Sequence, residues 1–82
     1  MFKKILIANR GEIAVRIVRA AQDLGVATVA VFAQDDAGAA HTLLAEEAMP
    51  LGATGPTAYL DIPALIHIAQ QTGCDEIGRA HV

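Results

Sequence analysis

Two apolar segments with a helical pattern between them constrain the fold of this chain more than any other feature. Residues 5–8, Ile-Leu-Ile-Ala, form a continuous apolar run typical of strands that are covered on both faces. From Ile13 to Leu24, apolar residues recur at helical spacing, and residues 28–32, Thr-Val-Ala-Val-Phe, form a second β-rich run. A strand, a helix and a strand within about thirty residues indicate a βαβ unit. Its two strands are expected to be parallel, with a right-handed crossover.

The ends of the first helix carry recognisable signals. Asn9 is expected to be the N-cap, with Glu12 three residues later reaching back as in a capping box. Gly25 stands where a left-handed C-cap belongs. Gly11 lies in the turn between strand and helix, where we expect it to permit tight packing.

The second half of the chain repeats the alternation with weaker signals. Its expected elements are a loop at 35–40, one or two helical turns at 41–47, a strand at 48–51, a loop at 52–57, a helix at 62–72 and a strand beginning at 74–77. Pro50 places the third strand near an edge or a strand end, and Asp61 is expected to cap the last helix. The sequence therefore predicts an open α/β domain with a parallel, Rossmann-like sheet of four strands.

Length and composition exclude several classes of protein. A chain of 82 residues is one small domain or part of one, and its single cysteine, Cys74, excludes an internal disulfide. The three histidines, His41, His67 and His81, show no zinc-binding spacing. A domain this small usually needs a disulfide, a metal or a partner surface for stability, so we expect further domains or a second subunit to provide it. Cys74 opens a buried strand and His67 lies on a helix without a visible acid beside it, so neither is expected to be catalytic.

Charge and hydropathy argue against nucleic acid as a partner and against a membrane or exported protein. The net charge is −3, from 6 basic and 9 acidic residues, which argues against nucleic acid binding by phosphate neutralisation. No apolar run approaches the ~18 residues of a membrane span. The apolar stretch near the start is too short for an export signal, so a cytoplasmic protein is expected.

The turn at residues 9–12 joins a strand to a helix N-terminus, a place that favours anions. A dinucleotide-binding fingerprint requires glycines at three spaced positions there, and this turn contains only Gly11. Asp35 and Asp36 follow the second strand, near the place of a ribose-binding acid. One matching acid without the glycine loop is a weak signal, so independent NAD binding is disfavoured and a capped helix is the simpler interpretation.

The outer face of the first helix carries paired charges. Glu12 with Arg16, and Arg19 with Asp23, have the i,i+4 spacing of helical ion pairs. Each such pair contributes only ~0.2–0.5 kcal/mol on an exposed helix. Spacing alone therefore favours a solvated face.

Residues 2–17, which include the block Ala-Asn-Arg-Gly-Glu-Ile-Ala, closely resemble the start of biotin carboxylases. The motif residues of that block are Asn9, Arg10, Gly11 and Glu12. Further matches keep the family order at 28–32, 41–48, 51–52, 59–62 and 72–75. The resemblance thus covers residues 2–75. Carbamoyl-phosphate synthase large subunits share the fold, but their opening block is different.

The resemblance implies an N-terminal domain that precedes an ATP-grasp domain and a C-terminal lobe. In such enzymes ATP and bicarbonate form carboxyphosphate, magnesium bridges the nucleotide phosphates, and the carboxyl group passes to biotin on a carrier domain. The catalytic, cofactor-binding and metal-binding residues lie beyond this chain, so none is assigned here and the fragment alone is expected to be inactive. The parent enzyme is expected to be a homo-oligomer, with Arg16, Arg19 and Asp23 as its candidate subunit interface. Family members commonly carry Glu at the position of Asp23.

The resemblance ends after Asp75, where family members continue toward a His-Pro-Gly-Tyr-Gly loop. Residues 76–82 are therefore expected to be a non-native tail, in which Gly78 and Arg79 interrupt an apolar run. The alternatives are a truncated paralogue with a short tail, and a tail that binds something through Arg79 and His81.

The alternative hypothesis, from another class of protein, is that the chain is a standalone nucleotide-binding or dimerisation module without catalysis. A downstream ATP-grasp domain in the gene would distinguish a biotin carboxylase fragment from such a module. The acyl acceptor of the parent cannot be read here, because the carboxyltransferase domain selects it.

Overall fold

Strands and helices alternate along the chain in the computed structural model, which describes residues 3–78. The elements are β1 Lys4–Ile7, α1 Gly11–Asp23, β2 Ala27–Phe32, the 3-10 helix η1 Gln34–Asp36, α2 Ala40–Leu44, β3 Glu47–Pro50, the 3-10 helix η2 Pro56–Leu60, α3 Ile62–Thr72 and β4 Glu76–Gly78. This order confirms the expected α/β class.

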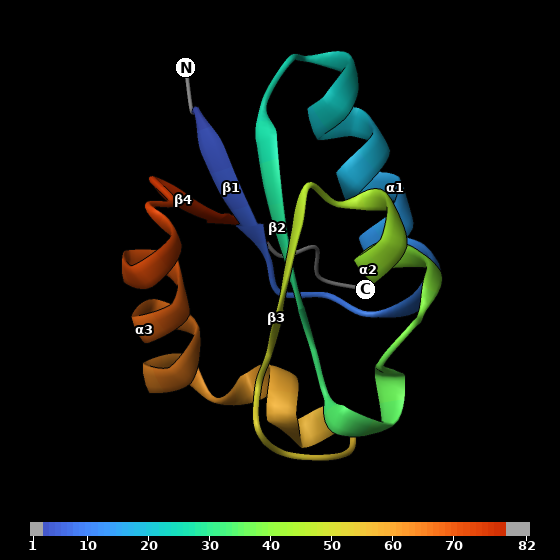
Figure 1. Ribbon diagram of the computed structural model, residues 1–82, viewed down its shortest axis with the longest axis vertical. Helices are drawn as coiled ribbons and strands as arrows, with labels where there is room; N and C mark the ends of the chain where they lie inside the picture. Colours follow the sequence, from blue (N-terminus) through green and yellow to red (C-terminus); the bar gives the residue numbers. More distant parts are fainter. Residues whose placement is uncertain (1–2, 79–82) are drawn as a thin grey trace.

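The four strands of the described part of the chain form one open sheet in the order β3-β2-β1-β4, and every neighbouring pair is parallel. The chain builds outward from β1 to β3 and then returns to place β4 on the other side of β1 (Figure 1). The reversal creates a topological switch point between β1 and β4, the place where open α/β proteins bind ligands beyond the carboxyl ends of the strands.

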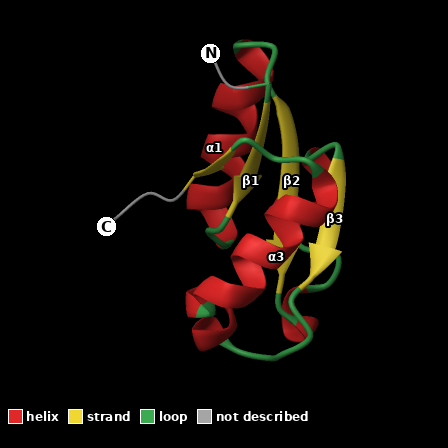
Figure 2. Ribbon diagram, turned by 90° about the vertical axis from the view of Figure 1, so that its left-hand side faces the viewer, coloured by secondary structure: helices red, strands yellow, loops and turns green. Residues whose placement is uncertain are grey.

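Helices cover both faces of the sheet, with α1 and α2 on one face and α3 on the other (Figures 1 and 2). Because neighbouring residues of a strand point to opposite faces, Leu6 packs on the α3 side with Leu65 and Ile68, whereas Ile7 packs with Val18 of α1. Both Leu6 and Ile7 are fully buried. This two-sided burial explains the continuous apolar run in the sequence of β1.

The C-terminal end of α1 is confirmed as a glycine cap. Gly25 has a φ of +72°, its N–H donates to the Gln22 carbonyl at 3.0 Å, and the Val26 N–H donates to the Ala21 carbonyl at 2.9 Å. This pair of bonds is the Schellman motif, which satisfies carbonyls that the helix end would leave free.

The expected N-terminal cap of α1 is wrong by one residue. Arg10, not Asn9, occupies the cap position, in an extended conformation and without a side-chain cap hydrogen bond. Gly11 has a φ of +65°, and no atom lies within 4 Å of where its Cβ would be. The glycine therefore serves a left-handed turn and not tight packing, and this turn moves the helix start past the expected cap.

In the second half of the fold, the helix cap and the edge strand match the sequence prediction, whereas several element boundaries differ from it. Asp61 caps α3, since its Oδ1 accepts the Ala64 N–H at 3.2 Å, and Pro50 ends the edge strand β3. Glu47 belongs to β3 and not to the preceding helical turn. The expected loop at 52–57 runs into η2, and β4 begins two residues later than expected. That delay arises because the Cys74 N–H still bonds to the Ala69 carbonyl of α3.

Candidate functional site

A polar cluster, here called the Asp36 cluster, lies at the carboxyl edge of the sheet and consists of Arg10, Asp36 and Tyr59. Arg10 Nη2 lies 2.9 Å from Asp36 Oδ1, and the Tyr59 hydroxyl donates to Asp36 Oδ2 at 2.7 Å. The Arg10 guanidinium also stands 5.9 Å from the centre of the Tyr59 ring. The three residues come from the turn after β1, from η1 after β2 and from η2, so the cluster joins three segments.

Tyr59 holds the centre of this cluster from a buried position. Its side chain is 4% exposed, and its hydroxyl accepts the Ala33 N–H at 3.0 Å while it donates to Asp36. Burial, and then the neighbouring Asp36 carboxylate, raise the pKa of Tyr59 to about 12. The phenol is therefore a stable hydrogen-bond donor at neutral pH and not a base.

Asp36 is held in its ionised form. The hydrogen bond from Tyr59, followed by the contact with Arg10, lowers the pKa of Asp36 below its usual value, although burial acts in the opposite direction. Both carboxylate oxygens already have partners within the chain, so Asp36 is part of the structural framework of this edge. Asp35, the other acid considered for ribose binding, accepts the Gly55 N–H at 3.0 Å. Both acids thus fasten loops at this edge.

Sequence reasoning missed the Asp36 cluster as a unit. Arg10 and Asp36 follow neighbouring parallel strands, whose carboxyl ends meet at one edge of the sheet, and this was a usable signal. Tyr59 carried no such signal, since it reaches the cluster from a 3-10 helix 23 residues beyond Asp36.

His41, on α2, is buried at the same end of β2. It is 1% exposed, and its Nε2 lies 3.2 Å from the Val31 carbonyl. Because a carbonyl only accepts, Nε2 carries the proton in this contact. Nδ1 has no hydrogen-bond partner among the described residues. His41 therefore attaches α2 to β2. His67 is exposed, as expected of a surface histidine.

Three residues proposed from the sequence, Arg16, Arg19 and Asp23, are all exposed on α1. Of the two expected ion pairs on this face, the described residues form only Glu12 with Arg16, at 3.5 Å, and both side chains are 78% exposed. An exposed pair of this kind contributes about 0–1 kcal/mol at most. The face therefore contributes little to the fold itself.

Beside these charges, the flank of α1 is apolar. A hollow of about 190 Å³ lies between α1 and β1 and is lined by Ile5, Ile17, Ala20, Ala21, Leu24 and Val26. Leu24, expected on the buried face of the helix, is instead 67% exposed at its C-terminal cap. A second hollow, of about 300 Å³, lies between α3 and β4 and includes Ile66, Cys74 and Ile77 in its lining.

Within residues 3–78, no three His, Cys, Asp or Glu side chains come together in a group that could hold a metal ion. None of the helices in this described part combines the length and apolar character needed to cross a membrane.

Comparison with known proteins identifies relatives along nearly the whole chain. The family model for the biotin carboxylase N-terminal domain matches residues 1–80. Biotin carboxylase 1 of Bacillus subtilis is 47% identical over 78 residues, and the biotin carboxylase of Haemophilus influenzae is 50% identical over 78 residues. Each alignment covers 94% of this chain and 17% of the relative, so the chain spans about a sixth of these proteins.

Solved structures agree with the sequence relatives. The biotin carboxylase domain of a single-chain bacterial carboxylase has a TM-score of 0.92 and 47% identity, and the match covers 96% of this chain and 18% of that one. The biotin carboxylase domain dimer of Hydrogenobacter thermophilus 2-oxoglutarate carboxylase, solved with MgADP, ADP and bicarbonate, has a TM-score of 0.93 and 38% identity. That match covers 99% of this chain and 18% of the other. From its sheet, its opening block and these relatives, the chain belongs to the biotin carboxylase N-terminal domain family.

Proposed function

We propose that this chain is the N-terminal part of an enzyme that carboxylates biotin with ATP and bicarbonate, through carboxyphosphate. The observation that carries the proposal is the family match over residues 1–80, together with biotin carboxylases that are 47% and 50% identical. Because the chain spans 17% of those relatives, the activity is proposed for the whole parent protein.

Among residues 3–78, no group of acids or histidines could hold a magnesium ion, and Arg10 at the carboxyl edge is paired with Asp36. We therefore assign no step of the reaction to these residues. The ATP-grasp domain, the C-terminal lobe and the biotin carrier domain of the parent are proposed to hold these groups and the catalytic residues.

The role proposed for this chain is to support the ATP-grasp cleft of the parent. The Asp36 cluster fixes the turn after β1 to η2, and this turn lies beside the switch point between β1 and β4. A fixed carboxyl edge gives a neighbouring domain a defined surface to pack on, because both carboxylate oxygens of Asp36 are anchored.

A subunit interface on α1 is the second part of this proposal. Arg16, Arg19 and Asp23 are exposed on one helix, and their charges do little for the fold of the chain. The biotin carboxylase domain of Hydrogenobacter thermophilus 2-oxoglutarate carboxylase is a dimer. We place the corresponding contact of the parent enzyme on this face of α1.

Phosphate release tests the assignment of chemistry to the later domains. The purified 82-residue chain, with ATP, magnesium, bicarbonate and free biotin, is expected to release no more phosphate than a buffer blank. The parent enzyme, recovered as the full gene product, is expected to release phosphate in a bicarbonate-dependent manner. Bicarbonate-dependent release by the short chain would show that the catalytic groups lie within it and would refute the proposal.

A further inference from the structure

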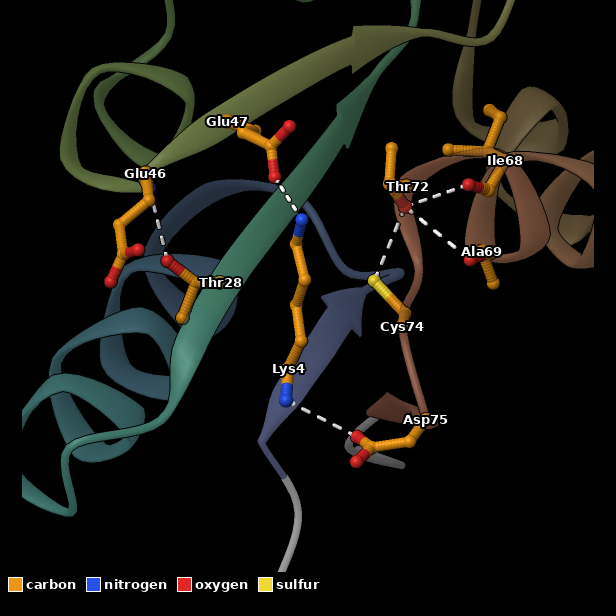
Figure 3. A network of polar contacts seen from close by, with 9 residues as sticks. All are labelled: Lys4, Thr28, Glu46, Glu47, Ile68, Ala69, Thr72, Cys74 and Asp75. Carbon is orange, nitrogen blue, oxygen red and sulfur yellow. Dashed lines mark hydrogen bonds and ion pairs between the residues drawn. The ribbon is translucent and has the colours of Figure 1, made fainter.

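The last strand is attached to the sheet by one carboxylate at its entrance. Asp75, the residue before β4, accepts the Lys3 N–H through Oδ2 at 3.0 Å and the Lys4 N–H through Oδ1 at 3.2 Å. Its own N–H donates to the Lys4 carbonyl at 3.0 Å. Figure 3 shows the carboxylate beside the backbone nitrogen of Lys4. Three hydrogen bonds thus converge where β4 meets β1.

The rest of β4 has few other attachments. Within residues 3–78 it is a three-residue edge strand whose partner in the sheet is β1. Glu76 is exposed, and Ile77 is partly buried against the α3 side of the core. The hollow of about 300 Å³ between α3 and β4 leaves this side of the strand incompletely packed. A strand with so little buried surface depends strongly on its hydrogen bonds.

We infer that Asp75 is an acid-labile clasp that holds β4 in register on β1 and releases it, ahead of the rest of the sheet, when the carboxylate is protonated. An ionised carboxylate accepts hydrogen bonds through both oxygens, and charge-assisted bonds are the stronger kind. A protonated carboxyl keeps less acceptor capacity, so the pair of bonds to β1 weakens.

The charged and titratable groups near Asp75 leave its carboxylate free to hold β4 on β1. Lys3 and Lys4 lie beside it, and the titratable residues next to it in sequence are Cys74 and Glu76. The Lys4 ammonium is itself paired with Glu47 on β3 (Figure 3), so Lys4 contributes to the clasp through its backbone N–H. From α3, the Thr72 hydroxyl lies 3.3 Å from Cys74 Sγ and does not reach the carboxylate.

The direction of the titration follows from the hydrogen bonds. The backbone N–H of Lys3, and then that of Lys4, hold the pKa of Asp75 below its usual value, and the nearby Lys3 charge acts in the same sense. The clasp is therefore complete above the unfolded-state value of about 3.9. It is lost as the pH falls through the lower folded-state value.

Amide hydrogen exchange of the 82-residue chain tests the clasp. The Ala8 N–H bonds to the Gly78 carbonyl at 3.0 Å and reports whether β4 is in place, whereas the amides of Val29 and Ala30 report on β2. At about pH 7, Asp75→Ala is expected to lower the protection factor of Ala8 about tenfold or more, with β2 unchanged. In the wild type, Ala8 should lose protection before β2 when the pH is lowered below about 4.

Glu47→Gln is the matched control, because it removes the negative charge paired with the Lys4 ammonium and leaves the backbone N–H groups of the clasp in place. It should keep the wild-type protection of Ala8. Equal protection of the Ala8 amide in Asp75→Ala and wild type would overturn the inference. So would a loss of Ala8 protection that occurs at the same pH as the loss of protection in β2. Should Asp75→Ala not fold, the wild-type pH series alone shows whether Ala8 loses protection before β2 or together with it.

Discussion

Replacing Tyr59 by Phe removes one hydroxyl from the Asp36 cluster and tests whether the cluster holds the carboxyl edge together. The hydroxyl donates to Asp36 at 2.7 Å and accepts the Ala33 N–H at 3.0 Å. Ala33 is fully buried, and the Asp36 side chain is only 15% exposed, so neither group can easily turn to water instead. The variant leaves both without this partner while the aromatic ring stays in place.

The expected cost follows from those two orphaned groups. A buried polar group that loses its partner costs about 1–3 kcal/mol, and bonds to charged groups lie at the upper end of that range. Because Asp36 keeps Arg10, we expect Tyr59→Phe to lower the free energy of unfolding by about 2–4 kcal/mol. A domain of this size has a total stability of only roughly 4–12 kcal/mol, so the loss is a large fraction of it.

Urea unfolding followed by far-UV circular dichroism measures this change. Thr42→Val is a suitable control, because it also deletes a hydroxyl, whose hydrogen bond runs locally to the Ala39 carbonyl at 2.6 Å. The control is expected to cost at most about 1 kcal/mol. A change of less than about 0.5 kcal/mol in Tyr59→Phe, the size of an ordinary surface substitution, would refute the assigned role of the cluster.

The same variant makes a prediction about acid. The pKa of Asp36 is lowered first by the Tyr59 hydrogen bond, so ionised Asp36 stabilises the fold above its unfolded-state value of about 3.9. This stabilisation is lost as the pH falls through the lower folded-state value. In Tyr59→Phe the pKa should move back toward the usual value, and the acid-dependent part of the stability should shrink. An unchanged dependence of stability on pH would contradict the attribution to Tyr59.

Two further predictions concern the parent enzyme and its gene. Arg19→Glu in the parent is expected to shift sedimentation toward monomer. The free energy of unfolding should change by only about 0–1 kcal/mol, because the side chain is exposed. An unchanged sedimentation profile would mean that this face of α1 is simply solvated. We also propose that residues 76–82 are not native, although the backbone of residues 76–78 pairs with β1 as β4; amplification from source DNA should then recover codons for a His-Pro-Gly-Tyr-Gly stretch after Asp75. Recovery of codons for residues 78–82 followed by a natural stop would refute that proposal.

Local patterns made much of this fold predictable. The periodicity of α1, the glycine cap at Gly25 and the Asp61 cap depend on residues close together in sequence, and the structure confirms each of them. Pro50 likewise indicated the edge strand β3, since proline cannot donate to a neighbouring strand. The family resemblance is confirmed by the match over residues 1–80.

The misses have a common physical cause, because each depends on backbone conformation or on long-range contacts. The left-handed Gly11 displaced the expected cap from Asn9, and a residue type alone does not reveal the sign of φ. Tyr59 lies 23 residues beyond Asp36 and reaches it from a 3-10 helix, so no local periodicity marks the contact. Leu24 fits the apolar spacing of α1 and is nevertheless exposed, because it is the C-cap residue, whose backbone (φ −90°, ψ 0°) has already left the helix.

The central claim, that this chain can serve as the N-terminal domain of a biotin carboxylase, is tested most directly by a chimera. Residues 3–75 would replace the matching segment of Biotin carboxylase 1 from Bacillus subtilis, which is 47% identical to this chain. The measurement is bicarbonate- and biotin-dependent ATP hydrolysis by the purified chimera. We expect activity within about tenfold of the intact relative, equivalent to a change of less than about 1.4 kcal/mol in the barrier. A folded chimera with no biotin-dependent hydrolysis would contradict the claim.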